Sequence, residues 1–130
     1  MAPVDLELNG RRVQSVLIEN SVVFELSGGC FIVIQSRMRI ERATGARTLF
    51  AEEDPDEELQ PIRELVGSTI DEATVDPAGA LRVRFSDGTR LQVEPDDAYE
   101  AWNVSGPNGA LTVCTPGGAL ATWSKNNQRI

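Results

Sequence analysis

The stretch RFSDGTRLQV at residues 84–93 decides how the chain is expected to fold. Apolar and polar side chains alternate on both sides of a Ser-Asp-Gly turn, which is the pattern of a β-hairpin with one buried face. A two-residue turn would put a core phenylalanine opposite an arginine, whereas a three-residue loop pairs Val83 with Leu91. The longer loop needs a positive φ at its last residue, Gly88, which glycine adopts at little cost.

A second stretch, ELSGGCFIVI at residues 25–34, repeats this pattern 59 residues earlier and predicts a left-handed Gly29. Upstream, Gly-x-x-Val at 10–13 matches Gly-x-x-Ile at 67–70 with an offset of 57. The two-residue difference falls in a predicted turn, where duplicated copies tolerate an insertion. A chance similarity of two hairpins is the alternative. We predict two copies of a three-strand meander, at about 11–36 and 68–95.

The two copies differ on their predicted outer faces. The second copy is polar there, with Arg82, Arg84, Arg90 and Gln92. The first carries Val23, Phe31 and Val33, and an apolar face of this kind is expected to be covered. The cover is either the short helix or the C-terminal strands of the same chain, or a second subunit. In the last case these three residues are the candidate homodimer interface.

An acidic segment separates the two copies. Its six carboxylates are Glu52, Glu53, Asp54, Asp56, Glu57 and Glu58. They are a candidate surface for a basic protein partner, or alternatively a solvated loop in which Asp54 caps a helix. The spacing does not fit an EF-hand calcium loop. We expect a linker and short helix over 43–67, with a loop at 43–55 and the helix near 60–66.

The rest of the chain predicts C-terminal strands within 98–123, followed by a frayed polar tail at 125–130. Trp102 is expected in the core and Trp123 near the end of the last strand. The predicted fold is a single domain over 1–130, α+β but mainly antiparallel β: two duplicated three-strand meanders, one short helix between them and a C-terminal β-hairpin. We expect the meanders to pack about a pseudo-two-fold axis.

A second acidic group lies beside Tyr99 and Trp102, and consists of Glu94, Asp96, Asp97 and Glu100. A carboxylate pair could hydrolyse a glycoside or hold a small ligand. The alternative is that Glu100 supplies the counter-charge for the arginine face of the second hairpin.

Several classes of function are disfavoured by composition. The chain has no histidine, no C-x-x-C pair and no glycine-rich phosphate loop, so we expect no catalytic residue, cofactor or metal. The net charge of −8 argues against nucleic acid and anionic membranes as partners. No membrane span or signal peptide is predicted. Cys30 and Cys114 are expected as buried thiols in a reducing cytoplasm rather than as a disulfide.

The motifs FSDG, YEAW and PGGALATW, which lie between residues 81 and 123, resemble those of a family of small bacterial proteins of unknown function. The family is common in actinomycetes, mycobacteria included. The resemblance implies no activity, although some members resemble small immunity proteins that neutralise bacterial toxins.

These features favour a non-catalytic cytosolic binding protein, immunity-like in character, that meets a basic protein through its acidic loop. A structural homo-oligomer is the first alternative. A small-ligand binder or carboxylate-based enzyme is the second.

Overall fold

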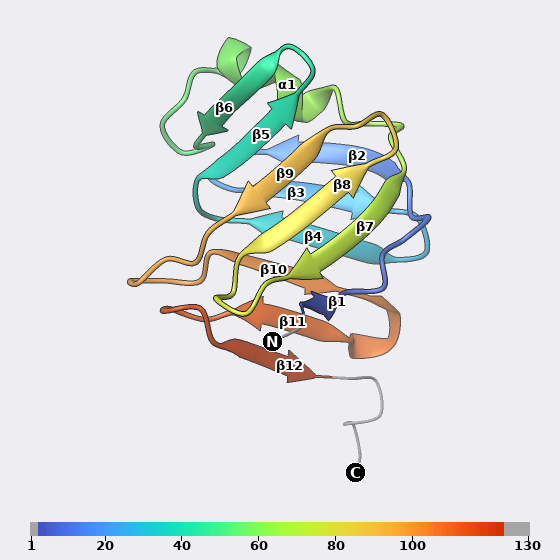
Figure 1. Ribbon diagram of the computed structural model, residues 1–130, viewed down its shortest axis with the longest axis vertical. Helices are drawn as coiled ribbons and strands as arrows, with labels where there is room; N and C mark the ends of the chain where they lie inside the picture. The colour runs from blue at the N-terminus through green and yellow to red at the C-terminus, as the bar shows by residue number, and fades with distance from the viewer. Residues whose placement is uncertain (1–2, 124–130) are drawn as a thin grey trace.

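Two six-stranded antiparallel sheets stack face to face in the computed structural model, which describes residues 3–123 (Figure 1). The first sheet has the order β1-β7-β8-β9-β5-β6, and the second has the order β12-β11-β10-β4-β3-β2. The predicted fold class is therefore confirmed: mainly antiparallel β, with one short helix and a C-terminal hairpin. The predicted tail at 125–130 lies outside the described residues.

The elements of the first half of the chain are β1 (Val4–Asp5), β2 (Val13–Ile18), β3 (Val22–Leu26), β4 (Cys30–Ile34), β5 (Met38–Arg42), β6 (Gly45–Leu49), a 3₁₀ turn (Asp56–Leu59) and α1 (Gln60–Arg63). Those of the second half are β7 (Ile70–Val75), β8 (Leu81–Phe85), β9 (Arg90–Val93), β10 (Trp102–Ser105), a second 3₁₀ turn (Pro107–Gly109), β11 (Leu111–Cys114) and β12 (Leu120–Trp123). No helix in the described part of the chain has the length and apolarity needed to cross a membrane.

Both meanders have the strand register that the turn chemistry predicts. Val83 pairs with Leu91 across the second hairpin, and its loop residue Gly88 has φ +93°. Phe24 pairs with Ile32 across the first, where Gly29 has φ +80°. Each meander also has one irregularity between its first two strands, at positions 57 residues apart.

The meanders are related by a pseudo-two-fold axis that passes between Arg12 and Thr69, which form a β-bridge. Two pairs of backbone hydrogen bonds, all 2.8–2.9 Å, surround this bridge. In the first pair, Gly10 N donates to Ile70 O and Gly67 N donates to Val13 O. In the second pair, Val13 N donates to Ser68 O and Ile70 N donates to Arg11 O. The residues in each pair are related by the 57-residue offset. The backbone around the bridge therefore follows the repeat found in the sequence.

The two sheets exchange strands after each meander. From β4 the chain crosses to the other sheet, where β5 pairs with β9. From β9 it crosses back, where β10 pairs with β4. Met38 and Trp102 begin these crossing strands, and both are buried between the sheets. Each meander is thus followed by a fourth strand that pairs with the sheet of the other meander.

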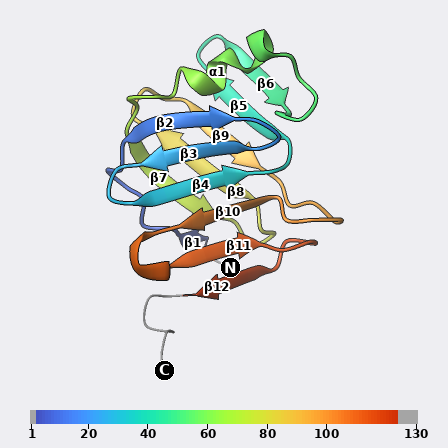
Figure 2. The same ribbon diagram turned by 180° about the vertical axis from the view of Figure 1, so that it is seen from behind.

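Trp102 is fully buried, as predicted, and its indole Nε1 donates to the Gly79 carbonyl at 3.1 Å. Burial of an aromatic side chain of this size contributes on the order of 2–3 kcal/mol. Cys30 and Cys114 are buried free thiols, in agreement with the prediction. The core is continuous between the two sheets and beneath α1, which closes one end of the sandwich (Figures 1 and 2).

The region between the meanders differs from its prediction. Residues 45–49 form β6 rather than a loop, because they pair with β5 as an exposed edge strand. The α-helix ends at Arg63, so the predicted helix near 60–66 is too long, and Val66 lies beyond its end with a half-exposed side chain. The prediction that Asp54 caps the helix is wrong, because its carboxylate instead accepts the Phe50 N–H at 2.7 Å.

Candidate functional surfaces

The outer faces of the two sheets have matching strand registers, as the predicted duplication would require. Offsets of 57, 59 and 64 residues relate β2 to β7, β3 and β4 to β8 and β9, and β5 to β10. By these offsets Val23 corresponds to Arg82, and Val33 corresponds to Gln92. The two faces therefore differ in side chains and share their backbone geometry.

We call the outer side of the β2-β3-β4-β10-β11-β12 sheet the apolar face. The registers align one row of positions on this side across all six strands: Leu17, Val23, Val33, Asn103, Val113 and Ala121, of which Val113 is buried. The adjacent row is Ser15, Glu25, Phe31, Ser105, Leu111 and Trp123. Only one of these twelve side chains carries a formal charge, and Glu25 accepts a hydrogen bond from the Ser15 hydroxyl.

Large apolar side chains on this face are open to solvent. Leu17 is 57% exposed, Trp123 is 49% exposed and Phe31 is 37% exposed. No described segment crosses the face, and the C-terminal strands extend the sheet instead of covering it (Figure 2). The expectation that α1 or these strands cover Val23, Phe31 and Val33 is therefore wrong for residues 3–123.

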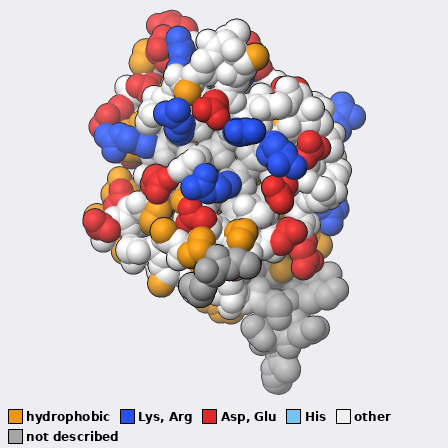
Figure 3. Space-filling view, in the orientation of Figure 1, with side chains coloured by type: hydrophobic (Ala, Val, Ile, Leu, Met, Phe, Trp, Pro, Cys, Tyr) orange, Lys and Arg blue, Asp and Glu red, His pale blue; other side chains and the backbone are white. Residues whose placement is uncertain are grey.

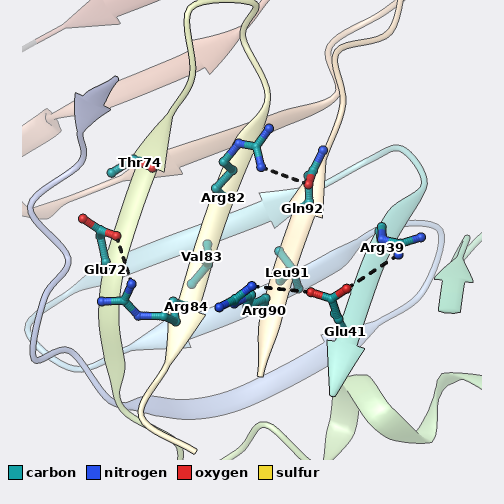
Figure 4. A pocket seen from close by; sticks show the side chains of 10 residues that line it. All are labelled: Arg39, Glu41, Glu72, Thr74, Arg82, Val83, Arg84, Arg90, Leu91 and Gln92. Carbon is teal, nitrogen blue, oxygen red and sulfur yellow. Dashed lines mark hydrogen bonds and ion pairs between the residues drawn. The ribbon is translucent and has the colours of Figure 1, made fainter. Parts of the chain in front are cut away.

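We call the outer side of β7, β8, β9 and β5 the arginine ladder (Figures 3 and 4). One row reads Glu72, Arg84, Arg90 and Glu41, and the adjacent row reads Thr74, Arg82, Gln92 and Arg39. As predicted, Arg84 and Arg90 lie directly opposite each other. Their acidic partners lie on the strands to either side, Glu72 on β7 and Glu41 on β5 (Figure 4).

The prediction that Glu100 neutralises these arginines is wrong. Arg84 pairs with Glu72 at 3.4 Å, and Arg90 and Arg39 share Glu41 at 3.8 and 3.7 Å. Glu72 could have been found by extending the predicted register to β7. Glu41 could not, because it reaches this sheet only through the strand exchange.

The remaining ladder arginine, Arg82, pairs with Asp76 at 3.1 Å. Burial alone would raise the pKa of the Asp76 carboxyl. Hydrogen bonds from the Ala80 N–H, from Arg82 and from the Ala78 N–H outweigh it, so the pKa lies below its ordinary value. Asp76 therefore remains ionised and holds both the β7–β8 turn and the Arg82 guanidinium.

The ladder encloses a shallow hollow of about 290 Å³, lined by both rows together with Val83 and Leu91. This volume lies near the lower limit for small-molecule sites. The hollow is open, and the side chains of its arginines are half exposed or more. Its charged and polar lining could contact a small polar ligand.

The acidic segment is partly neutralised within the chain. Glu53 pairs with Arg37, Asp56 with Arg63 and Glu58 with Arg47. The Asp54 carboxylate is used by the Phe50 N–H. Glu52 and Glu57 are exposed, and no ion pair joins either to another residue within 3–123. The segment thus presents less free negative charge than its sequence indicates.

The second acidic group is also used by the fold. The Asp96 carboxylate accepts the Ala98 N–H at 2.7 Å, and Tyr99 lies before β10 rather than in a strand. Glu100 and Tyr99 border an open hollow with Glu52, so the two acidic regions meet at one end of the sandwich. Among residues 3–123, no three His, Cys, Asp or Glu side chains are grouped to hold a metal ion.

Burial raises the pKa of the Cys114 thiol, and this effect outweighs a hydrogen bond from the backbone of Ala101, which lowers it. The sulfur lies 3.5 Å from the Gly79 carbonyl oxygen in the core. A buried thiol with a raised pKa is a poor nucleophile. Cys114 is therefore a packing residue rather than a reactive group.

Comparison with known families adds one finding. A family model described as "Family of unknown function (DUF6188)" matches residues 4–124. The chain belongs to DUF6188. The match spans both sheets of this DUF6188 protein, so the apolar face and the arginine ladder both lie within the family domain. It agrees with the resemblance to a family of unknown function, while the bacterial group and the individual motifs remain predictions. No curated protein and no solved structure matches the chain.

Proposed function

We propose that this DUF6188 protein is a non-catalytic binding protein that associates with a second copy of itself through the apolar face. The observation that supports this proposal is the contrast between equivalent positions. The same scaffold carries arginine and glutamine at 82 and 92 but two valines at 23 and 33. The register therefore does not require apolar residues there, and exposed apolar patches of this kind are typical of interaction sites.

A second copy is the favoured occupant because the face is complementary to itself. A two-fold interface brings each residue of a patch near the same patch of the partner. The row from Leu17 to Ala121 contains no charge, so its self-contact creates no like-charge repulsion. Stacking of apolar sheet faces about 10 Å apart is also how the two sheets of the monomer pack.

The size of the apolar face indicates how strongly two copies are expected to associate. Six strands and two rows span about 24 Å by 14 Å, and two such faces would bury on the order of 1,000 Å² of accessible surface. This lies at the low end for specific interfaces. We expect weak self-association, with a dissociation constant on the order of 10–100 μM, which corresponds to a binding free energy of about 5–7 kcal/mol.

Sedimentation equilibrium tests the proposal with a variant taken from the protein's own second sheet. The double variant Val23→Arg/Val33→Gln installs the residues of the equivalent positions 82 and 92. Wild type should approach twice its 14.1 kDa mass at about 1 mM, and the double variant should remain monomeric. The control Thr48→Arg changes an exposed position on the opposite sheet and should dimerise like wild type. A monomeric wild type at that concentration would refute self-association.

A second candidate is the binding of a basic protein through the acidic end of the sandwich. It is favoured by the hollow in which Glu52, Glu100 and Tyr99 meet without a basic residue. The double variant Glu52→Lys/Glu57→Lys should lose a partner captured by wild type from native lysate, in a salt-dependent manner. Equal capture by wild type and variant would exclude this surface.

A further inference from the structure

We infer that the arginine ladder is a binding site for a small, multiply charged oxyanion ligand, which carries either phosphate or several carboxylates. The first supporting observation is a deficit of negative charge. Four arginines, at positions 39, 82, 84 and 90, share three described acidic partners, Glu41, Glu72 and Asp76. Glu41 alone serves two guanidinium groups. The ladder arginines therefore outnumber their paired carboxylates by one, and two further acids lie at its margins, where Asp5 pairs with Thr74 and Glu94 accepts a hydrogen bond from Gln92.

The second observation is the direct opposition of Arg84 and Arg90 on neighbouring strands. Like charges directly opposite each other destabilise a sheet, and in this row Glu72 and Glu41 flank the two arginines. The equivalent positions of the other sheet hold Glu25 and Phe31, so the scaffold accepts other residues there. The cationic pair is thus a feature of this face and is not required by the fold.

The third observation is that the existing ion pairs are easily exchanged. The pairs of Glu41 and Glu72 measure 3.4–3.8 Å, and their side chains are roughly half exposed. Exposed pairs of this kind contribute little to stability. An incoming oxyanion can therefore take guanidinium donors from these carboxylates at small cost. Two opposed guanidiniums also offer the paired N–H donors that suit phosphate and carboxylate oxygens.

The hollow limits the size and kind of ligand. Its volume of about 290 Å³ suits one small molecule, and Thr74 and Gln92 add uncharged hydrogen-bonding groups beside the arginines (Figure 4). The acidic remainder of the surface repels a long polyanion such as nucleic acid. A compact anion can be bound by the local donors without meeting that repulsion over its whole length.

NMR titration at constant ionic strength tests the inference, with inorganic pyrophosphate and citrate as the two probes. We expect saturable chemical-shift changes of the amides of β7, β8, β9 and β5. Tighter binding of pyrophosphate would indicate a phosphate site, and tighter binding of citrate would indicate a carboxylate site. The double variant Arg84→Gln/Arg90→Gln should bind the tighter probe at least tenfold more weakly. Arg84→Lys/Arg90→Lys keeps the charge but loses the planar donors, and should give a smaller loss.

Arg47→Gln on β6 is the matched control, because it removes one exposed positive charge of the same sheet outside the hollow. It should bind like wild type. Linear shifts with both probes, or an equal loss of affinity in Arg47→Gln, would show only nonspecific ionic attraction and would overturn the site. These outcomes do not depend on dimerisation, because the ladder and the apolar face lie on opposite sides of the molecule (Figures 1 and 2).

Discussion

A methyl group added at Gly79 should destabilise the fold more than the same change at a left-handed glycine with open space around it, such as Gly88. Gly79 lies in the β7–β8 turn, with φ +100°. A Cβ there would lie 2.3 Å from the carbonyl oxygen of Gly118, which belongs to the β11–β12 turn. The Gly79 carbonyl also accepts the indole N–H of Trp102. Gly79→Ala therefore perturbs a backbone contact between the two sheets and the anchor of the largest core side chain.

Gly88 isolates the conformational part of this effect. Its φ is +93°, and a Cβ there would meet nothing within 4 Å. Gly88→Ala should cost about 1–2 kcal/mol, the penalty for a left-handed alanine. Gly79→Ala adds overpacking against backbone, which typically costs about 1–3 kcal/mol. The total for Gly79→Ala is then about 2–5 kcal/mol.

Urea unfolding measures the difference between these two variants. With a slope of about 2 kcal/mol per M, an extra 2 kcal/mol moves the midpoint of Gly79→Ala about 1 M below that of Gly88→Ala. Gly118→Ala should resemble Gly79→Ala, because its Cβ would lie 2.3 Å from the Ala78 carbonyl oxygen. Equal midpoints for Gly79→Ala and Gly88→Ala would refute the close contact between the two turns.

Three further predictions follow from the core and the β7–β8 turn. The pKa of Asp76 is lowered in the folded state, so its contribution to stability is complete above about pH 5 and is lost as the pH falls through the folded pKa. The Tm of Asp76→Asn should therefore fall less steeply than that of wild type between about pH 5 and pH 2. An equal slope in both proteins would contradict this role of Asp76. Trp102→Phe removes a buried hydrogen bond and leaves a cavity, so it should lower the free energy of unfolding by about 2–4 kcal/mol. Chemical denaturation measures this loss, and a loss below about 1 kcal/mol would argue against the packing of Trp102. Cys30 and Cys114 should resist iodoacetamide in the native protein and react in urea, as mass spectrometry can record; rapid native alkylation of Cys114 would contradict its burial.

The hairpin registers could be predicted from sequence because local chemistry determines them. Glycine at 29 and 88 selects the loop, and the alternation of apolar residues then leaves one register that buries every core side chain. The strand β6 could not be predicted in this way. Four of its five residues are exposed, so no alternation marks it, and it is ordered by pairing with β5. Tertiary pairing, rather than local preference, forms this edge.

The candidate surfaces were predictable to a similar extent. The outward positions of Val23, Phe31 and Val33 follow from the hairpin register, and their role as an interface remains a prediction. That Leu17 and Trp123 join them depends on the order of six strands, which no local pattern encodes. In the same way, the opposition of Arg84 and Arg90 follows from one turn, but the fourth strand that brings Glu41 beside them arrives through the exchange between sheets.

The central claim, that the apolar face joins two copies of the chain, is tested most directly by following backbone amide NMR signals during dilution from about 1 mM to about 10 μM. We expect concentration-dependent shifts confined to β2, β3, β4, β10, β11 and β12, and we expect none in Val23→Arg/Val33→Gln. Shifts confined to β7, β8, β9 and β5, or spectra that do not change with concentration, would contradict it.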